Sequence, residues 1–485
     1  MEIFGGFCMR TIIVWFENDL RVSDNPALYY ASKQGRVVPV FIYASDNVRE
    51  LGGAKKWWLH KSLLSLIESL KSLGVKLIIR KGKDSSSVLK SLISEVHADS
   101  VYWNKRFDPL AKSRDENIKK ELISSGINVE CFDGFLLHNP NSFFTADGKP
   151  YGVFTPFWKK FQNEIVVSAP LPVPERLQGV EFDVHLERLE DLNLLPKIKW
   201  YAEMENFWSV SEQDAQKRLN WFISHALDGY GENRDRPDLD GTSLMSPYLA
   251  SGLISPRQIW HSVVNSKKNG VSEGAEAFLR ELAWREFSYH VLYHNPDMVN
   301  ANLKKEFDAF PWRWDKTDDY VKWTKGLTGI PIIDAGMRQL WKTGWMHNRV
   351  RMIVASWLTK NLLIHWKIGE EWFWDTLVDA DIANNVQGWQ WTAGCGADAA
   401  PYFRIFNPVL QSKKFDPKGM YIRKWVPELA KLPDEYIHEP WNAPVYLLKM
   451  IGLELGKDYP LPMASIEETR KRALEAFEKI RRKNL

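Results

Sequence analysis

The sequence has few cysteines and no long apolar run. Its three cysteines, Cys8, Cys131 and Cys395, are far apart and form no CxxC pair, so they predict no disulfide framework. No stretch reaches the roughly 18 apolar residues of a membrane-spanning helix. The first residues, MEIFGGFCMRTIIVWF, lack the basic start and long apolar core of a signal peptide. We therefore expect a cytoplasmic protein in a reducing compartment, with no membrane partner.

An excess of one charge sign is also lacking. Lys and Arg number 64 and Asp and Glu 61, which leaves a net charge of +3 over 485 residues. A nucleic-acid site would have to be a local basic patch. The chain has no GxSxG, HExxH, Walker or kinase motif, which argues against the common hydrolase and phosphotransfer chemistries. His347 has no second His or Cys at ligand spacing, so we predict no metal site.

Residues 9–139 alternate short β-branched runs with amphipathic helices. The clearest helix, residues 54–73, has leucines at three- and four-residue spacing and ends at Gly74. This alternation predicts a doubly wound parallel sheet. No GxGxxG follows the first strand, so a dinucleotide site in this α/β domain is disfavoured. The predicted strands are residues 11–16, 37–43, 75–80, 100–103 and 127–132.

A proline-containing segment, residues 140–206, has poor periodicity and is predicted to be a long linker. Residues 207–485 have long apolar-periodic segments and almost no alternating runs, which predicts a helical domain. The expected fold class is therefore α/β followed by all-α. The clearest helices are predicted at residues 212–227, 273–294 and 348–366 and from Ser465 onward.

Tryptophan is concentrated in one part of the helical domain. Residues 341–391 hold eight of the 23 tryptophans. Such crowding indicates either a large aromatic core, or stacking on a flat ligand and electron transfer between rings. Residues 379–408, DADIANNVQGWQWTAGCGADAAPYFRIFNP, place acids and paired asparagines among small residues. Because buried polar groups need partners, this mixture favours a site.

Three hydroxyl side chains follow a glycine and precede a predicted helix around Pro247. They are Thr242, Ser243 and Ser246. Hydroxyls and free N–H groups at a helix start suit a pyrophosphate. Ordinary helix capping is the alternative, because Ser and Thr are common at helix starts.

Two helix faces gather polar and aromatic side chains at three- and four-residue spacing. On the first face, a carboxylate could hydrogen-bond a base edge while an indole packs on the base; the alternative is a surface Glu beside a half-buried Trp. On the second face, an arginine could pair with Asp379 or Asp381 and hold two segments together. The first face consists of Glu281, Trp284 and Arg285, and the second of Asn348, Arg351 and Met352.

Six motifs in one order resemble the photolyase/cryptochrome family, most closely its cyclobutane pyrimidine dimer photolyases. They are GTSLMSPYL, FLRELAWREF, WMHNRVRM, DADIANN, GWQW and DAAPYFRIFNP, and WFENDLRVSDNPAL is similar to the family's first strand and helix. The resemblance implies an α/β antenna domain and a helical domain that holds FAD. It also implies that reduced flavin, excited by light, passes an electron to a flipped-out dimer in UV-damaged DNA, which splits and returns the electron.

The resemblance implies roles for individual residues. Around FAD it places Tyr230, Thr242, Ser243, Met245, Ser246, Arg285, Trp345, Asn348, Arg351, Asp379, Asp381 and Asn385. Against the lesion it places Glu281, Trp284, Asn348, Met352 and Trp391, and against the DNA backbone Arg234, Arg349 and Arg404. Glu281 and Asn385 are the expected catalytic residues, together with an electron relay of Trp389, Trp366 and an outer Trp312, for which Trp314 is the alternative.

Single positions separate the branches of the family. The (6-4) photolyases carry histidines where this chain has Asn348 and Met352, which disfavours that substrate. Plant cryptochromes carry Asp in place of Asn385, which favours repair over signalling. The C-terminal EYIHEPWNAPVYLLKMIGLELGKDYPLP nevertheless resembles the plant cryptochrome branch.

The antenna and the competing functions stay open at this stage. Residues 103–115, WNKRFDPLAKSRD, do not match the folate signature of some family members, which leaves methenyltetrahydrofolate, a deazaflavin or no antenna. The leading hypothesis is a monomeric DNA repair enzyme acting on double- or single-stranded DNA. A blue-light receptor that signals through a partner, and a Trp-rich nucleic-acid binding module without chemistry, are the alternatives.

Overall fold

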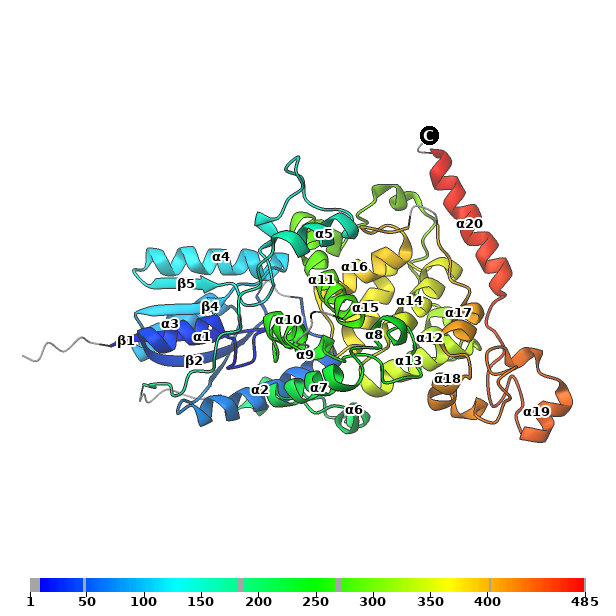
Figure 1. Cartoon of the computed structure of the whole chain (residues 1–485), viewed down its shortest axis with the longest axis horizontal. Coiled ribbons are helices and arrows are strands. Elements are labelled where there is room, and N and C mark those ends of the chain that lie inside the picture. Colours follow the sequence, from blue (N-terminus) through cyan, green and yellow to red (C-terminus); the bar gives the residue numbers. More distant parts are fainter. Residues whose placement is uncertain are drawn as a thin grey trace, which may run out of the picture.

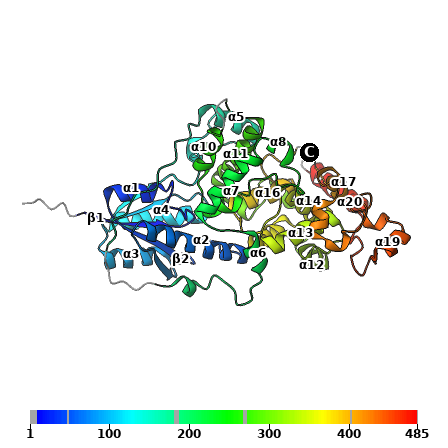
Figure 2. The same cartoon turned by 60° about the horizontal axis from the view of Figure 1, so that its bottom comes forward.

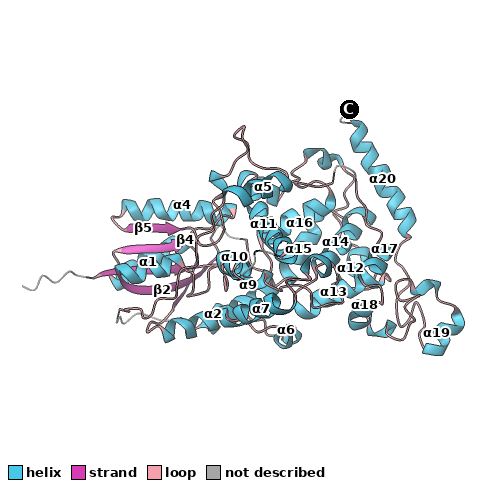
Figure 3. Ribbon diagram, in the orientation of Figure 1, coloured by secondary structure: helices cyan, strands magenta, loops and turns pink. Residues whose placement is uncertain are grey.

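The computed structural model describes residues 9–46, 49–180, 187–266, 270, 272–400 and 403–483. A five-stranded parallel sheet lies at one end of the molecule, and helices form the rest (Figure 1, Figure 3). The strand order is β3-β2-β1-β4-β5, which confirms the doubly wound prediction. The strands are β1 (Arg10–Phe16), β2 (Gly35–Ala44), β3 (Ile78–Gly82), β4 (Ser100–Asn104) and β5 (Asn128–Phe132).

Alternate side chains of the sheet enter two different cores, as the pleat of a strand requires. Ile13 and Trp15 of β1 pack in a core formed with α3 (Ser85–Val96) and α4 (Pro109–Ser124). Ile12 and Val14 face α1 (Pro26–Gln34) and α2 (Gly53–Ser72), and this second core continues into the helical domain. The α/β domain is therefore joined to the helical domain by apolar packing.

The segment predicted as a linker contains helices. They are η1 (Pro140–Ser142), α5 (Phe154–Glu164), η2 (Leu189–Leu192) and α6 (Ala202–Phe207). Phe154 and Phe157 of α5 contact Phe287 of the helical domain, with ring centroids 5.7 and 5.3 Å apart. Part of residues 140–206 thus belongs to the packing of the helical domain.

In the helical domain, the other helices lie around α11 and α16. The helices α19 and α20 lie at the end of the molecule far from the sheet in both views (Figure 1, Figure 2). None of the described helices is long and apolar enough to span a membrane. The α-helices are α7 (Glu212–His225), α8 (Tyr230–Asn233), α9 (Ser246–Ser251), α10 (Pro256–Val264), α11 (Glu273–His294), α12 (Asp318–Lys325), α13 (Pro331–Thr343), α14 (Asn348–Ser356), α15 (Trp366–Thr376), α16 (Ile382–Ala393), α17 (Pro408–Phe415), α18 (Met420–Trp425), α19 (Val445–Ile451) and α20 (Ile466–Lys483). The shorter turns are η3 (Pro296–Val299), η4 (Lys305–Ala309), η6 (Pro427–Leu429), η7 (Pro440–Asn442) and the π-helical η5 (Trp357–Asn361).

The prediction of one helix over residues 348–366 is wrong. After α14 the chain widens into η5, and Leu363 then adopts a left-handed conformation with φ 56°. A leucine in this conformation ends the helix. His365 starts the next helix, because its Nδ1 accepts a hydrogen bond from the backbone N–H of Lys367 at 3.0 Å. The break separates the two elements that carry Asn348 and Trp366.

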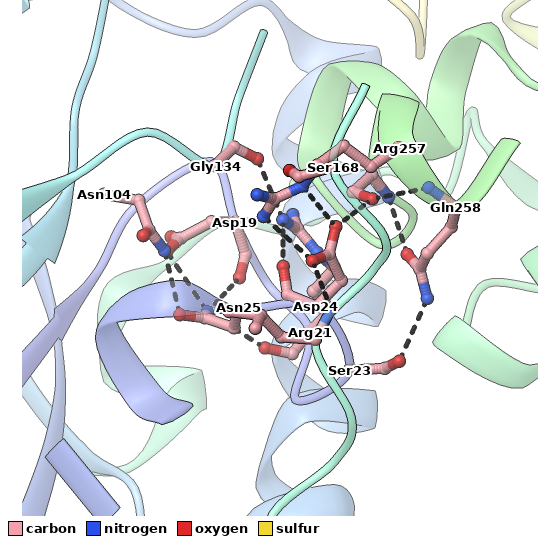
Figure 4. Close-up of polar contacts among 12 residues, drawn as sticks. Asp19, Arg21, Ser23, Asp24, Asn25, Asn104, Gly134, Ser168, Arg257 and Gln258 are labelled. Carbon is pink, nitrogen blue, oxygen red and sulfur yellow. Dashed lines mark hydrogen bonds and ion pairs between the residues drawn. The ribbon is translucent and has the colours of Figure 1, made fainter. Parts of the chain in front are cut away.

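A buried polar cluster also joins the two domains (Figure 4). The guanidinium of Arg21, which is 1% exposed, donates to the carbonyls of Gly252 at 3.0 Å and Asp24 at 2.8 Å. The carboxylate of Asp24 accepts from Ser255 and, at 3.0 Å, from Nε of Arg257, with which it also forms an ion pair. Because a buried charge needs partners, these contacts fix how the two domains dock.

Candidate active site

One cavity of about 600 Å³ opens in the helical domain between α8, α9, α11, α14 and α16. Its volume lies within the range of small-molecule and cofactor sites. Of the predicted site residues, seventeen line it together: Tyr230, Arg234, Ser243, Met245, Ser246, Glu281, Trp284, Arg285, Asn348, Arg349, Arg351, Met352, Asp379, Asp381, Asn385, Trp389 and Trp391. Thr242, Trp312, Trp345, Trp366 and Arg404 do not line it.

The acid-asparagine segment forms one wall of the cavity. Asp381 is the N-cap of α16, and its carboxylate accepts hydrogen bonds from the backbone N–H and side-chain amide of Asn384 at 2.9 and 2.7 Å. The hydroxyl of Tyr289 also donates to Asp381. A carboxylate at the N-cap both starts the helix and is stabilised by its dipole. The cap thus fixes the side chains of α16 that line the cavity.

Arg351 of α14 holds its helix to the acid-asparagine segment, although only one of its two predicted partners, Asp379, is used. Its guanidinium donates to Asp379 at 2.8 Å, and Ser246 donates to the same carboxylate oxygen at 2.6 Å. The other oxygen of Asp379 is buried without a partner among the described residues. The buried side-chain oxygen of Gln387, also in the cavity wall, has no partner there either.

These unpaired acceptors test whether the cavity fits FAD. A buried acceptor without a donor is costly, so a ligand that carries N–H or O–H groups is expected beside it. The ribityl hydroxyls, ring N–H and amino groups of FAD provide such donors. The residues present therefore fit the cofactor that the motifs imply.

The other side of the cavity is aromatic and charged. Trp284 stacks on Phe154 of α5, with ring centroids 3.8 Å apart and planes at 10°. Glu281 pairs with Arg234, and their side chains are 26% and 21% exposed. Burial raises the pKa of Tyr230, whose ring lies below Arg234. This side offers a flat ring and a carboxylate to a ligand.

Asn385 lines the cavity but is anchored away from it. Its side-chain nitrogen donates to the carbonyl and the carboxylate of Glu370, at 3.0 and 2.7 Å. Glu370 is fully buried in α15 and pairs with Arg49 of the α/β domain. Neither Glu370 nor Arg49 was singled out from the sequence, because their positions differ by 321 residues.

The α/β domain also donates hydrogen bonds to α9, a helix of the helical domain that forms part of the cavity wall. The ammonium of Lys55 in α2 donates to the carbonyl of Ala250 at 3.0 Å, and the indole of Trp58 donates to Ser251 at 2.9 Å. Burial lowers the pKa of Lys55 to about 8, while the nearby acids of the cavity wall act in the opposite direction. Lys55 is a further residue that the sequence analysis missed.

The two inner tryptophans of the predicted relay lie on neighbouring helices. The ring of Trp389 packs against Gly369 of α15, where an added Cβ would lie 2.2 Å from the ring. Trp366 lies three residues before this glycine, on the same face of α15. It is fully buried, and its indole N–H donates to Asn302 at 2.7 Å. This arrangement brings Trp389 and Trp366 to one interface.

The ring of His365 lies between Trp366 and the two tryptophans that could be the outer member of the predicted relay, Trp312 and Trp314. Its ring centroid is 5.3 Å from Trp366, 5.2 Å from Trp312 and 3.8 Å from Trp314. Trp314 is 62% exposed, whereas Trp312 is half-buried. The choice of Trp312 stays a prediction.

Four further residues have structural positions that leave their predicted roles untested. The carbonyl of Thr242 accepts from Arg218 at 2.7 Å, and the indole of Trp345 donates to Ser246 at 3.3 Å. Arg349 pairs with Asp235 at 2.7 Å, at the cavity wall. Arg404 is exposed, as expected for a contact with DNA phosphates.

Comparison with known proteins identifies the family of the chain. Residues 12–175 match the family model described as DNA photolyase, and residues 278–479 match the model of the FAD binding domain of DNA photolyase. The chain is 47% identical to deoxyribodipyrimidine photo-lyase of Agrobacterium fabrum, over 97% of this chain and 98% of the relative. It is 38% identical to cryptochrome-2 of Arabidopsis thaliana, over 97% of this chain and 79% of that protein.

A solved structure agrees with these sequence matches. The crystal structure of a bacterial class III photolyase from Agrobacterium tumefaciens superposes with a TM-score of 0.96 at 46% identity, and the match covers 99% of this chain and 100% of that one. Both domains are thus accounted for by one family. The chain belongs to the photolyase/cryptochrome family and has its FAD-binding domain.

Proposed function

We propose that this protein is a DNA photolyase, an enzyme that uses light to split cyclobutane pyrimidine dimers in DNA. One observation carries the proposal: the residues expected around FAD and those expected around the lesion line the same cavity. A dimer has to leave the base stack to enter such a cavity. When bound, FAD supplies the light-excited electron donor.

The residues of the chain bind and orient the two ligands. Arg351, Asp379 and Ser246 form a hydrogen-bonded group whose remaining acceptor, the second oxygen of Asp379, has no partner among the described residues and is left for the flavin. On the lesion side, the indole of Trp284 is stacked on Phe154 and is therefore already ordered. It loses little further rotational freedom when a base stacks on it. Glu281 is a carboxylate placed to stabilise charge or a proton on the base.

The substrate, setting and assembly are parts of the same proposal. Asn348 and Met352 in the cavity wall favour cyclobutane dimers over (6-4) lesions. We propose that the enzyme acts as a monomer in the cytoplasm, on double- or single-stranded DNA. Size-exclusion chromatography and cell fractionation test the assembly and the location.

The decisive experiment measures repair. The FAD-loaded protein is mixed with an oligonucleotide that contains one cyclobutane dimer and is illuminated with blue light. We expect loss of the dimer in light, none in darkness, and slower loss in Glu281→Ala. Lys61→Met is a matched control, because it removes only the partly exposed ion pair of Lys61 with Glu205 outside the cavity.

Signalling through a partner is the second candidate, and the match to cryptochrome-2 is the observation that favours it. The repair assay distinguishes the two functions. A protein that binds FAD but leaves the dimer intact under light would be a receptor and not a repair enzyme. An intact dimer in a protein that binds no FAD would exclude both.

A further inference from the structure

Glu370 is a buried carboxylate whose main partner comes from the other domain. Its side chain is 0% exposed, and its two oxygens accept from the guanidinium of Arg49 at 2.5 and 3.0 Å. Arg49 lies between β2 and α2, and its guanidinium packs over the ring of Trp374 at 4.2 Å. Such a bidentate pair is strong and fixes the geometry of both groups. The α/β domain thus reaches a charged group deep in the helical domain.

Glu370 in turn dictates the orientation of the Asn385 amide. The side-chain nitrogen of Asn385 donates to the backbone carbonyl of Glu370 and to one of its carboxylate oxygens. An amide has two donor hydrogens, so both are used here. The amide oxygen accepts no hydrogen bond from any described residue, and Asn385 lines the cavity. The cavity therefore meets an acceptor, not a donor, at this position.

We propose that Arg49 is a positioning residue for the cofactor cavity: through its two hydrogen bonds to the carboxylate of Glu370, it holds the Asn385 amide with its oxygen toward the cavity. An ionised carboxylate can only accept hydrogen bonds, so it demands the NH₂ group of Asn385. A protonated carboxyl could donate, and the amide could then turn and present NH₂ to the cavity. The inference rests on the proposed function, because the ligand that uses this oxygen is FAD.

The charges around Glu370 decide how it responds to the loss of Arg49. Among the described residues, two charged groups face it: Arg49, and Lys367 of its own helix at 3.1 Å. Asn385, from α16, is neutral. The other acids of α15 bond to other partners. Without Arg49, a fully buried carboxylate with one cation left takes up a proton more readily.

The test follows FAD binding as the pH changes. The dissociation constant of FAD is measured by fluorescence between about pH 5 and about pH 9 for the parent, Arg49→Met and Arg49→Lys. We expect the ratio of the Arg49→Met constant to the parent constant to rise at least tenfold toward low pH, because the variant has lost the guanidinium that opposes uptake of a proton by this buried carboxylate. Arg49→Lys keeps the charge and should stay close to the parent at every pH.

Two further variants separate positioning from a general loss of structure. Glu370→Gln imitates the protonated carboxyl, so it should bind FAD as weakly as Arg49→Met does at low pH, and its ratio to the parent should not depend on pH. Lys61→Met, which removes a partly exposed ion pair from the neighbouring helix α2, should follow the parent. A constant ratio for Arg49→Met across the pH range overturns the proposal.

A second measurement does not depend on FAD. The free energies of unfolding of the flavin-free parent, Arg49→Met, Asn385→Ala and the double variant form a double-mutant cycle. Coupled groups give non-additive changes. Additive changes overturn the proposal even if FAD binds. A parent that binds no FAD refutes the proposed function, while the cycle still decides whether Arg49 acts on Asn385.

Discussion

Asn385→Asp replaces an amide that donates two hydrogen bonds by a carboxyl that, once ionised, can only accept. The groups it would face are the carbonyl and the carboxylate of Glu370, which now lie 3.0 and 2.7 Å from the side-chain nitrogen. The position is also buried, at 9% exposure. Both the desolvation and the neighbouring acceptors oppose ionisation. We therefore expect the pKa of the introduced carboxyl to be raised.

The size of the effect follows from the charges nearby. Two unit charges about 4 Å apart repel by about 4 kcal/mol at an effective dielectric constant of about 20. Arg49 and Lys367 already lie against Glu370 and offset part of this repulsion. A remaining penalty of about 2 kcal/mol corresponds to a rise of about 1.5 pKa units.

The raised pKa belongs to the folded state, so it makes stability depend on pH. Relative to the parent, the variant is most stable below about pH 4, the ordinary range of Asp, where the carboxyl is protonated in both the folded and the unfolded states. As the pH rises through the folded-state value, the unfolded state releases the proton first and the free energy of unfolding falls. The deficit relative to the parent should reach about 2 kcal/mol near neutral pH.

Urea denaturation of the flavin-free proteins at several pH values measures this deficit. Asn385→Ala is the control, because it loses the same two hydrogen bonds without adding a charge. If Asn385→Asp and Asn385→Ala differ from the parent by the same amount at every pH, the electrostatic reasoning is wrong. With FAD bound, an ionised carboxyl at this position should also repel the negative charge of reduced flavin and lower repair, which the dimer assay measures.

Three further predictions concern other parts of the molecule. Trp389→Phe should block light-driven reduction of bound flavin, followed by visible absorption, while chemically reduced protein still splits dimers, because Phe keeps the packing on Gly369 but is harder to oxidise. Arg21→Met should lower the free energy of unfolding in urea by about 3 kcal/mol, because buried carbonyls lose their donor, whereas Lys61→Met should cost less than about 1 kcal/mol. Burial lowers the pKa of His347 to about 4, so the unfolded state binds its proton first and stability is lost as the pH falls from about 6.5 toward 4. His347→Asn keeps a side chain that can cap the helix but removes the titrating imidazole. Between about pH 6.5 and 4, its free energy of unfolding in urea should therefore fall by about 3 kcal/mol less than that of the parent. An equal fall in both proteins would contradict the role given to His347.

The parts of the fold that the sequence predicted best have local causes. The predicted helix at residues 273–294 coincides with α11, because the hydroxyl of Ser272 caps its first turn and its apolar spacing is regular. The five predicted strands match the sheet to within a few residues, since β-branched runs are bounded by turns. Local spacing also grouped the two helix faces correctly, and all six of their residues line the cavity.

The errors lie where distant contacts or unusual backbone decide the structure. Nothing in residues 348–366 marks Leu363 as a residue with positive φ, so the pattern continued through the break. The helix α5 was missed although its buried side chains, Phe154, Phe157, Trp158 and Phe161, recur at helical spacing; α11, against which it packs, lies more than 100 residues later. Contacts of this kind can be read only from the folded structure.

The domain boundary drawn from the sequence is therefore not a boundary of the site. The cavity lies in the helical domain, as the missing glycine fingerprint of the α/β domain predicted. Yet Arg49 holds Glu370, and Lys55 and Trp58 hold the end of α9, so the α/β domain supplies buried donors on two sides of that cavity. Carbonyls and carboxylates that lose such donors pay a desolvation cost of about 1–3 kcal/mol each. Docking of the α/β domain thus contributes to the shape of the cofactor cavity, independently of any antenna that the domain carries.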